Sequence, residues 1–220
     1  MTETPYRKTT DLPEVFPVFP LAGALLLPRG RLPLNVFEPR YLNMVDDALA
    51  SRRLIGMIQP VASDDLENPG LFPVGCIGRI TAFRETGDGR YLITLTGLCR
   101  FNVSEELPCT TPYRQVHGDF TPYTDDLLPA EPNDEIGRDR LLEALKAYLG
   151  RRRMDTDWDA IQKASNEGLV NSLSMIGEFN AEEKQLLLEA QTLAKRAEIL
   201  TALIEFANAA SRGAPDAPLQ

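Results

Sequence analysis

The segment PLNVFEPRYL, residues 33–42, decides the first part of the fold. An extended apolar stretch ends at Phe37, and Glu38-Pro39 then opens a helix. Proline is favoured at the first position of a helix because its missing N–H would have no partner there. From Arg40 to Arg52 the apolar residues recur every three or four positions. The sequence therefore predicts a strand followed directly by a helix whose apolar face lies on a sheet.

Short apolar segments on both sides of this stretch predict a β-rich first half. Residues 54–59 form a continuous apolar run typical of a buried strand. Residues 74–86 and 91–98 are predicted to form a hairpin, because the Gly-Asp-Gly sequence at 87–89 suits a tight turn. A further strand is expected at 113–120. The many prolines between residues 17 and 33 favour sheet edges, bends and barrel corners, where no ladder donor is needed.

The second half has helical periodicity. A proline- and aspartate-rich connector at 121–132 precedes a helix predicted at 135–149, two short helices, and a run from Asn180 to Ala210. This run is compatible with one long helix or with two helices that break near residues 190–192. The prediction is an α+β protein with a β-rich subdomain at 12–123, a helical bundle at 133–210 and a disordered tail at 211–220.

Composition and charge disfavour several functional classes. The chain has 220 residues, 43% of them hydrophobic, and a net charge of −9. That charge opposes attraction to nucleic acid backbones and to anionic membranes. No apolar run approaches the roughly 20 residues that span a bilayer, and the first residues do not resemble a signal peptide. Together with an odd number of cysteines, these features predict a cytoplasmic protein with no membrane partner.

The side chains that carry chemistry are few. Cys76, Cys99, Cys109 and the single histidine, His117, equal in number the ligands of a structural zinc site. Their spacing lacks the close pairs of such sites, so Cys76 and Cys99 are predicted to be small buried hydrophobes. A Cys109–His117 nucleophile pair has no third group nearby in the sequence to orient it. We therefore predict no catalytic residues, no metal and no cofactor.

The remaining candidate site is apolar. A loop that ends in Leu71 and Phe72 lies next to strands that carry prolines, and such strands offer an open edge to an extended peptide. The residues predicted to line a peptide-binding groove are Met57, Leu66, Leu71 and Phe72. The alternative interpretation is that Met57 belongs to the core and that the loop only covers one end of the barrel.

A set of motifs resembles the N-terminal domain of Lon protease. They are FPVFPL at 16–21, PLNVFEPRY at 33–41, GCIG at 75–78, GLCRF at 97–101 and EKQLLLE at 183–189. The resemblance covers about residues 14–208 and is closest to stand-alone bacterial proteins that consist of this domain alone. It implies a strongly bent, PUA-like β pseudobarrel followed by a helical bundle. It also implies that this region engages unfolded substrate polypeptides.

The sequence and the resemblance together favour a non-enzymatic polypeptide-recognition module that acts in protein quality control. No GxxxxGK[ST] phosphate loop is present, and we expect neither an ATPase nor a peptidase part. The expected partners are unfolded or apolar polypeptide segments and a full-length protease, and homo-oligomerisation stays open. Two alternatives remain: a PUA-like RNA-binding module, and a small-molecule binder or enzyme that uses the barrel mouth.

Overall fold

The computed structural model describes residues 6–61, 69–129, 136–152 and 154–213. The predicted strand and helix around residues 33–42 are confirmed, because β2 ends at Val36 and α1 begins at Pro39. The elements in chain order are η1 (Thr9–Asp11), β1 (Val15–Pro20), β2 (Arg31–Val36), α1 (Pro39–Ala50), β3 (Leu54–Pro60), β4 (Leu71–Glu85), β5 (Tyr91–Leu107), β6 (Gln115–Asp119), η2 (Thr121–Leu127), α2 (Arg138–Arg152), α3 (Trp158–Lys163), α4 (Asn166–Ile176), α5 (Ala181–Glu189) and α6 (Leu193–Gly213).

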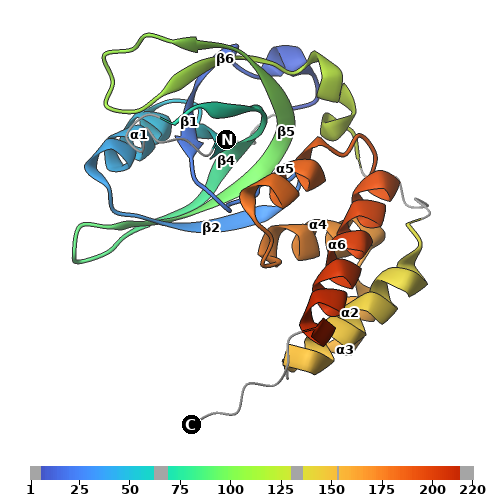
Figure 1. The fold of residues 1–220 in the computed structure, drawn as a ribbon. Coiled ribbons are helices and arrows are strands. Elements are labelled where there is room, and N and C mark those ends of the chain that lie inside the picture. The colour runs from blue at the N-terminus through green and yellow to red at the C-terminus, as the bar shows by residue number, and fades with distance from the viewer. Residues whose placement is uncertain (1–5, 62–68, 130–135, 153, 214–220) are drawn as a thin grey trace. The chain divides into compact units, whose positions relative to one another are not determined.

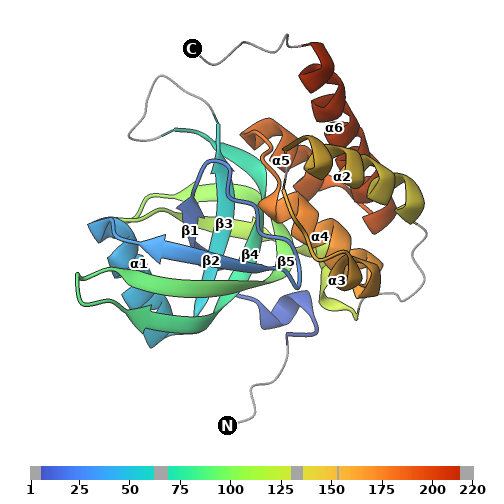
Figure 2. The same cartoon turned by 90° about the horizontal axis from the view of Figure 1, so that it is seen from below.

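The strands form one mixed, six-stranded sheet that closes on itself (Figures 1 and 2). The strand order is β2-β5-β4-β3-β1-β6, and β6 also pairs with β5, which completes a barrel. The long strand β5 makes this closure, because it pairs with β4 from Tyr91 to Asn102 and with β6 from Asn102 to Leu107. β1 and β3 run parallel, and the other pairings are antiparallel. β2 lies outside the ring as an edge strand.

Aromatic rings fill the barrel. Phe16 and Phe101 lie edge to face with their ring centroids 4.8 Å apart, and Phe120 lies 5.6 Å from Phe16. Gly75 lies next to the Phe101 ring and leaves no room for a side chain. A Cβ atom at this position would lie 2.4 Å from the ring. The residue after η1 and residues from β1, β3, β4, β5 and β6 complete this core, namely Leu12, Val18, Leu54, Ile58, Ile77, Cys99 and Val116.

A second apolar layer lies under α1. The helix buries Tyr41, Met44, Val45 and Ala48, and the Tyr41 ring lies 4.1 Å from the ring of Phe19 in β1. The buried side chain of Gln59 holds the segment after β1, because it accepts from Gly23 N–H and donates to the Ala24 carbonyl, both at 2.9 Å. Leucines 25, 26 and 27, which follow it, are buried.

The chain divides into two compact units, and the division differs from the predicted one at α5. The first unit contains residues up to 129 together with 178–188, and the second contains 130–177 and the residues from 189 onward. The sequence analysis placed 178–188 in the helical bundle. In the structure Lys184 Nζ donates to the Gly23 carbonyl at 2.6 Å and Gln185 Nε2 donates to the Val74 carbonyl at 3.1 Å, so α5 packs on the β-rich unit. The sequence left open whether the run from Asn180 to Ala210 forms one helix or two. It forms two, because α5 ends at Glu189 and α6 begins at Leu193.

The second unit consists of α2, α3, α4 and α6. A buried hydrogen bond of 3.0 Å from Arg196 Nη1 to Asn171 Oδ1 joins α6 to α4, and Arg140 pairs with Glu205 at 2.7 Å between α2 and α6. α6 continues to Gly213, past the predicted start of the disordered tail at 211, and residues 214–220 lie outside the described residues. None of the described helices has the length and apolar composition needed to cross a bilayer.

Candidate functional site

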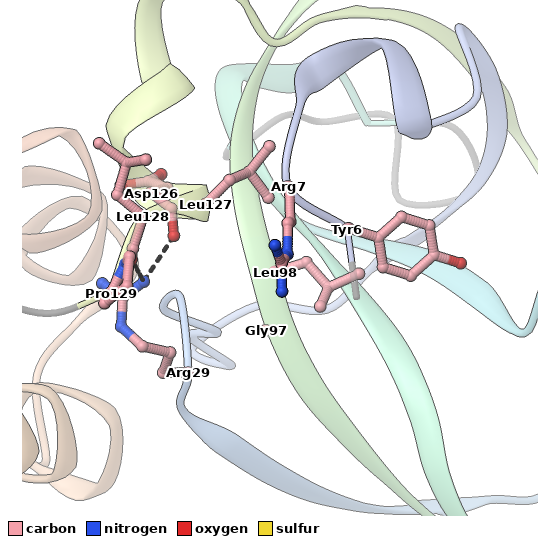
Figure 3. Close-up of a pocket in the computed structure, with 9 residues that line it drawn as sticks. All are labelled: Tyr6, Arg7, Arg29, Gly97, Leu98, Asp126, Leu127, Leu128 and Pro129. Carbon is pink, nitrogen blue, oxygen red and sulfur yellow. Dashed lines mark hydrogen bonds between the residues drawn. The ribbon is translucent and has the colours of Figure 1, made fainter. Parts of the chain in front are cut away.

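The first unit contains a cavity of about 580 Å³ beside β5 and η2 (Figure 3). Its walls come from four separate parts of the chain: the residues before η1, the turn before β2, the middle of β5, and the end of η2 with the residues that follow it. Most of the lining is apolar and includes two arginines and one aspartate. The lining residues are Tyr6, Arg7, Arg29, Gly97, Leu98, Asp126, Leu127, Leu128 and Pro129.

Gly97 and Arg29 are hydrogen-bonded neighbours in the lining of this cavity. Arg29 N–H donates to the Gly97 carbonyl at 2.8 Å, and Gly97 N–H donates to the Gly30 carbonyl at 2.9 Å. A Cβ atom on Gly97 would lie 2.1 Å from the Leu27 carbonyl oxygen, so only glycine fits here. Arg29 has a φ of 64°, a left-handed conformation that is uncommon outside glycine. Such backbone strain is often concentrated at functional sites.

The Arg29 side chain is fixed against η2. Its Nη1 donates to the carbonyls of Asp126 and Leu128, at 2.5 and 3.2 Å. Figure 3 shows Arg29, Asp126 and Pro129 together on one side of the cavity and Tyr6 on the other, with Arg7 between them in this view. The strained turn therefore places one guanidinium in the wall of the cavity.

The carboxylate of Asp126 is occupied by Arg100. Arg100 Nε and Nη2 contact Asp126 Oδ2 and Oδ1, each at 2.8 Å, and the Arg100 N–H donates to Oδ2 at 2.9 Å. Both residues are less than one-tenth exposed. Burial acts to lower the pKa of Arg100, but the hydrogen bonds and the charge of Asp126 outweigh it and raise that pKa. Arg100 therefore keeps its positive charge, and its guanidinium lies directly against the Asp126 carboxylate.

Arg7 is the second cation of the lining. It is exposed, and its backbone N–H donates to Asp11 Oδ2 at 2.9 Å. Its guanidinium makes no ion pair with any carboxylate of the described chain. Two arginines and one aspartate, whose carboxylate is bound by Arg100, thus stand among the mostly apolar residues that line this cavity.

The residues predicted to bind peptide do not line this cavity. Met57 is 2% exposed and belongs to the core, which is the alternative interpretation that the sequence analysis gave. Leu71 and Phe72 begin β4 and are partly exposed, and Leu71 also packs against the barrel core. Leu66 lies outside the described residues. The structure thus places Leu71 and Phe72 together near the surface and Met57 inside.

The cysteines and the histidine are dispersed. Cys76 and Cys99 are buried, as predicted, and burial together with the charge of Asp126 raises the pKa of the Cys99 thiol to about 12. His117 lines a second cavity of about 490 Å³, with its Nε2 3.6 Å from Glu14 Oε2. Within the described ranges no three His, Cys, Asp or Glu side chains lie close enough to hold a metal ion. The zinc alternative therefore gains no support from this geometry.

Comparison with known proteins places the chain in a family. Residues 15–205 match the family model of the ATP-dependent protease La (LON) substrate-binding domain. This chain belongs to the Lon substrate-binding domain family. The resemblance found in the sequence motifs is thereby confirmed over most of the chain.

Solved structures with the same fold are also Lon N-terminal domains. The Lon N-terminal domain protein from Xanthomonas campestris aligns over 86% of this chain and 97% of its own, with a TM-score of 0.59 and 22% identity. The N-terminal domain of Mycobacterium avium complex Lon protease aligns over 87% of this chain and 98% of its own, with a TM-score of 0.63 and 18% identity. The α+β fold with helices in its C-terminal part is thus that of Lon N-terminal domains.

Curated relatives of this Lon substrate-binding domain are much longer proteins. Lon protease from Anaeromyxobacter dehalogenans is 26% identical over 209 residues, which cover 88% of this chain and 23% of the relative. Lon protease 2 from Myxococcus xanthus is 28% identical over 209 residues, which cover 88% of this chain and 24% of the relative. The chain therefore spans about a quarter of the length of the proteases it matches.

Proposed function

We propose that this chain recognises unfolded or apolar polypeptide segments and performs no chemical step on them. The observation that carries the proposal is the match of residues 15–205 to a family model named for substrate binding. Because the matching relatives are Lon proteases, the proposal includes a full-length protease as a partner and cytoplasmic protein quality control as the setting.

An apolar surface in the first unit supports this proposal. Leu71 and Phe72 are partly exposed at the start of β4, and Val61, which follows the paired strand β3, is 39% exposed. The Val61 N–H donates to the Gly70 carbonyl at 2.8 Å, which keeps the two strand ends together. Contiguous apolar side chains at a surface are typical of sites that bind other chains. We propose Leu71 and Phe72 as contacts for apolar side chains of the bound segment.

Isothermal titration with a permanently unfolded model polypeptide tests the function. We expect measurable, weak binding that persists when salt is raised, because apolar burial is not screened by ions. Phe72→Ser should weaken this binding. Phe206→Ser is the matched control, since Phe206 is 70% exposed and belongs to the second unit. Absence of heat and of retention on immobilised unfolded polypeptide would remove the support for the proposal, and binding only at low salt would indicate an electrostatic, RNA-like partner instead.

A further inference from the structure

We propose that the outer edge of β2 binds an extended polypeptide segment as an additional strand of the sheet, and that this segment alternates acidic with apolar residues. The inference rests on the proposed function only in taking the ligand to be a polypeptide. It adds a second place of contact, made by backbone groups rather than by Leu71 and Phe72, and a residue pattern that this place selects.

The strand β2 lies at the border of the sheet (Figure 1). Among the described strands it pairs with β5 alone, in antiparallel register from Arg31 opposite Thr96 to Val36 opposite Tyr91. No other strand of the described chain lies along its second edge. Unpaired backbone groups at the edge of a sheet are a template for another extended chain.

Pro33 determines which backbone groups face this open edge. Successive residues of an antiparallel pair turn their N–H and C=O groups alternately toward the partner strand and away from it. Pro33 has no N–H, so it fits the paired part of β2 only where its nitrogen faces away from β5. Arg31 and Asn35, two positions to either side, face the same way. The bond from Gly97 N–H to the Gly30 carbonyl agrees with this alternation, since Gly30 then faces β5 and Arg31 faces away.

The open edge therefore presents two donors and three acceptors. They are the N–H groups of Arg31 and Asn35 and the carbonyls of Arg31, Pro33 and Asn35. Within the described ranges none of these groups has a hydrogen-bond partner. An extended peptide supplies the complementary N–H and C=O groups at the same spacing, because both chains have the repeat of a β-strand. A phosphate backbone has no such alternation and would leave the edge unpaired.

The two faces of this edge favour different side chains. Arg31, Pro33 and Asn35 are exposed on one face, whereas Leu32 and Leu34 are half-buried on the other. Side chains alternate in the same way along an added strand, so every second residue of the ligand lies beside the two leucines. Apolar residues fit these positions, because they cover the exposed parts of Leu32 and Leu34.

The remaining residues of the ligand lie on the face that carries Arg31. Arg84 of β4 shares this face, because it pairs with Leu92, which in turn pairs with Asn35. Arg31 and Arg84 are exposed, and neither makes an ion pair with a carboxylate of the described ranges. A glutamate or aspartate beside Arg31 forms a cross-strand, charge-assisted pair. Acidic residues therefore match this face.

The same residues make a second copy of this chain a poor occupant. Antiparallel pairing of two β2 strands about their centre would set the two Pro33 residues opposite each other, so neither would donate a hydrogen bond there. It would also join two faces that each carry Arg31, and like charges across neighbouring strands are destabilising. The acidic segment of another protein has neither disadvantage.

Two isomeric peptides test whether the backbone edge is used. Both consist of four Val-Glu repeats with a fluorophore at the amino end, and they carry N-methyl groups on the valine amides or on the glutamate amides. Only one alternate set of amides faces β2 in an added strand, so fluorescence anisotropy with the whole protein should show at least about tenfold weaker binding of one isomer. Loss with the glutamate set would indicate antiparallel pairing, and loss with the valine set parallel pairing.

Equal affinity of the two isomers would overturn the assignment of β2, and so would failure of the unmethylated peptide to bind. Either result would leave the proposed function intact, because the titration with an unfolded polypeptide and Phe72→Ser tests that function separately.

Matched charge reversals locate the peptide on the sheet. Arg31→Glu should weaken binding of the unmethylated Val-Glu peptide about fivefold and strengthen binding of the corresponding Val-Lys peptide, because the residue beside the ligand changes sign. Arg84→Glu is the control, since it makes the same change on the same face but two strands away from the edge. Circular dichroism checks that both variants fold. Equal loss of affinity in both would indicate a general attraction of polyanions, as for a nucleic acid, and would overturn the proposal.

Discussion

Arg100 and Asp126 form a buried ion pair in which both carboxylate oxygens accept from one guanidinium at 2.8 Å. The same guanidinium lies 4.6 Å from the ring centroid of Tyr123 and donates to the Leu188 carbonyl at 3.2 Å. A single side chain from β5 therefore contacts η2 and α5, which lie far apart in the sequence. The pair therefore links the barrel and the wall of the cavity to α5. This helix comes late in the sequence but belongs to the first unit.

Removing one partner of this pair should destabilise the protein strongly. We expect Asp126→Ala to lower the free energy of unfolding by about 3–5 kcal/mol, because the Arg100 charge would stay buried without compensation. Glu38→Gln is the control, since Glu38 pairs with Arg40 at 2.9 Å on the exposed surface and should cost less than about 1 kcal/mol. Urea unfolding followed by circular dichroism measures both, and equal midpoints for the two variants would contradict the assigned role.

Gly97 should tolerate no side chain. We expect Gly97→Ala to cost about 3 kcal/mol or more, because the new Cβ would overlap the backbone carbonyl of Leu27, which cannot rotate away. Gly87→Ala, in the turn between β4 and β5, meets nothing within 4 Å and should change stability by less than about 0.5 kcal/mol. Thermal unfolding compares the two, and a stable Gly97→Ala protein would show that the turn before β2 is free to move.

The elements that the sequence predicted depend on local rules. Pro39 and the preceding alternation place the β2–α1 boundary within a few residues, whatever the rest of the chain does. The assignment of α5 could not be predicted in this way, because an amphipathic pattern says that a face is buried but not what covers it. Its contacts to the first unit come from Lys184 and Gln185. Both are polar residues, which are expected from the sequence to be exposed to solvent.

The cavity is a second feature that local sequence patterns could not predict. Arg29 and Asp126 are in contact although they lie 97 residues apart in sequence, and no local pattern connects either of them to Arg7. A local sign in the sequence is Gly97, because a glycine inside a strand often marks a bulge or the close approach of another backbone segment. Long-range pairing, rather than any motif, brings the two arginines into the lining of one cavity.

Thiol reactivity should separate the three free cysteines. Cys76 and Cys99 are fully buried, which keeps a reagent away from both sulfurs, and the pKa of Cys99 is also raised to about 12. Cys109 is exposed. We expect a maleimide to label only Cys109 in the folded protein and all three residues in urea, with mass spectrometry counting the adducts. Cys109→Ser should abolish the labelling of the folded protein, and rapid modification of Cys99 would show that the barrel opens.

The free energy of unfolding should decrease at alkaline pH because of the ionisation of Tyr113. Its hydroxyl donates to Asp47 Oδ2 at 2.6 Å, and burial, followed by the hydrogen bond and the charge of Asp47, raises the pKa of Tyr113 from 10.0 to about 12. Between pH 10.0 and about 12 the folded state keeps a proton that the unfolded state releases, so the stabilisation from this group is complete below pH 10.0 and is lost as the pH rises through about 12.

Tyr113→Phe isolates this contribution. At neutral pH the variant should lose about 1 kcal/mol for the missing hydrogen bond. Its unfolding midpoint should then fall less steeply than that of the unchanged protein between pH 10.0 and about 12, because no phenol titrates at this position. Tyr41 and Tyr91, whose pKa values are also raised, are present in both proteins, so their effects cancel in the comparison. Parallel curves for the two proteins would show that the Tyr113 proton is not coupled to folding.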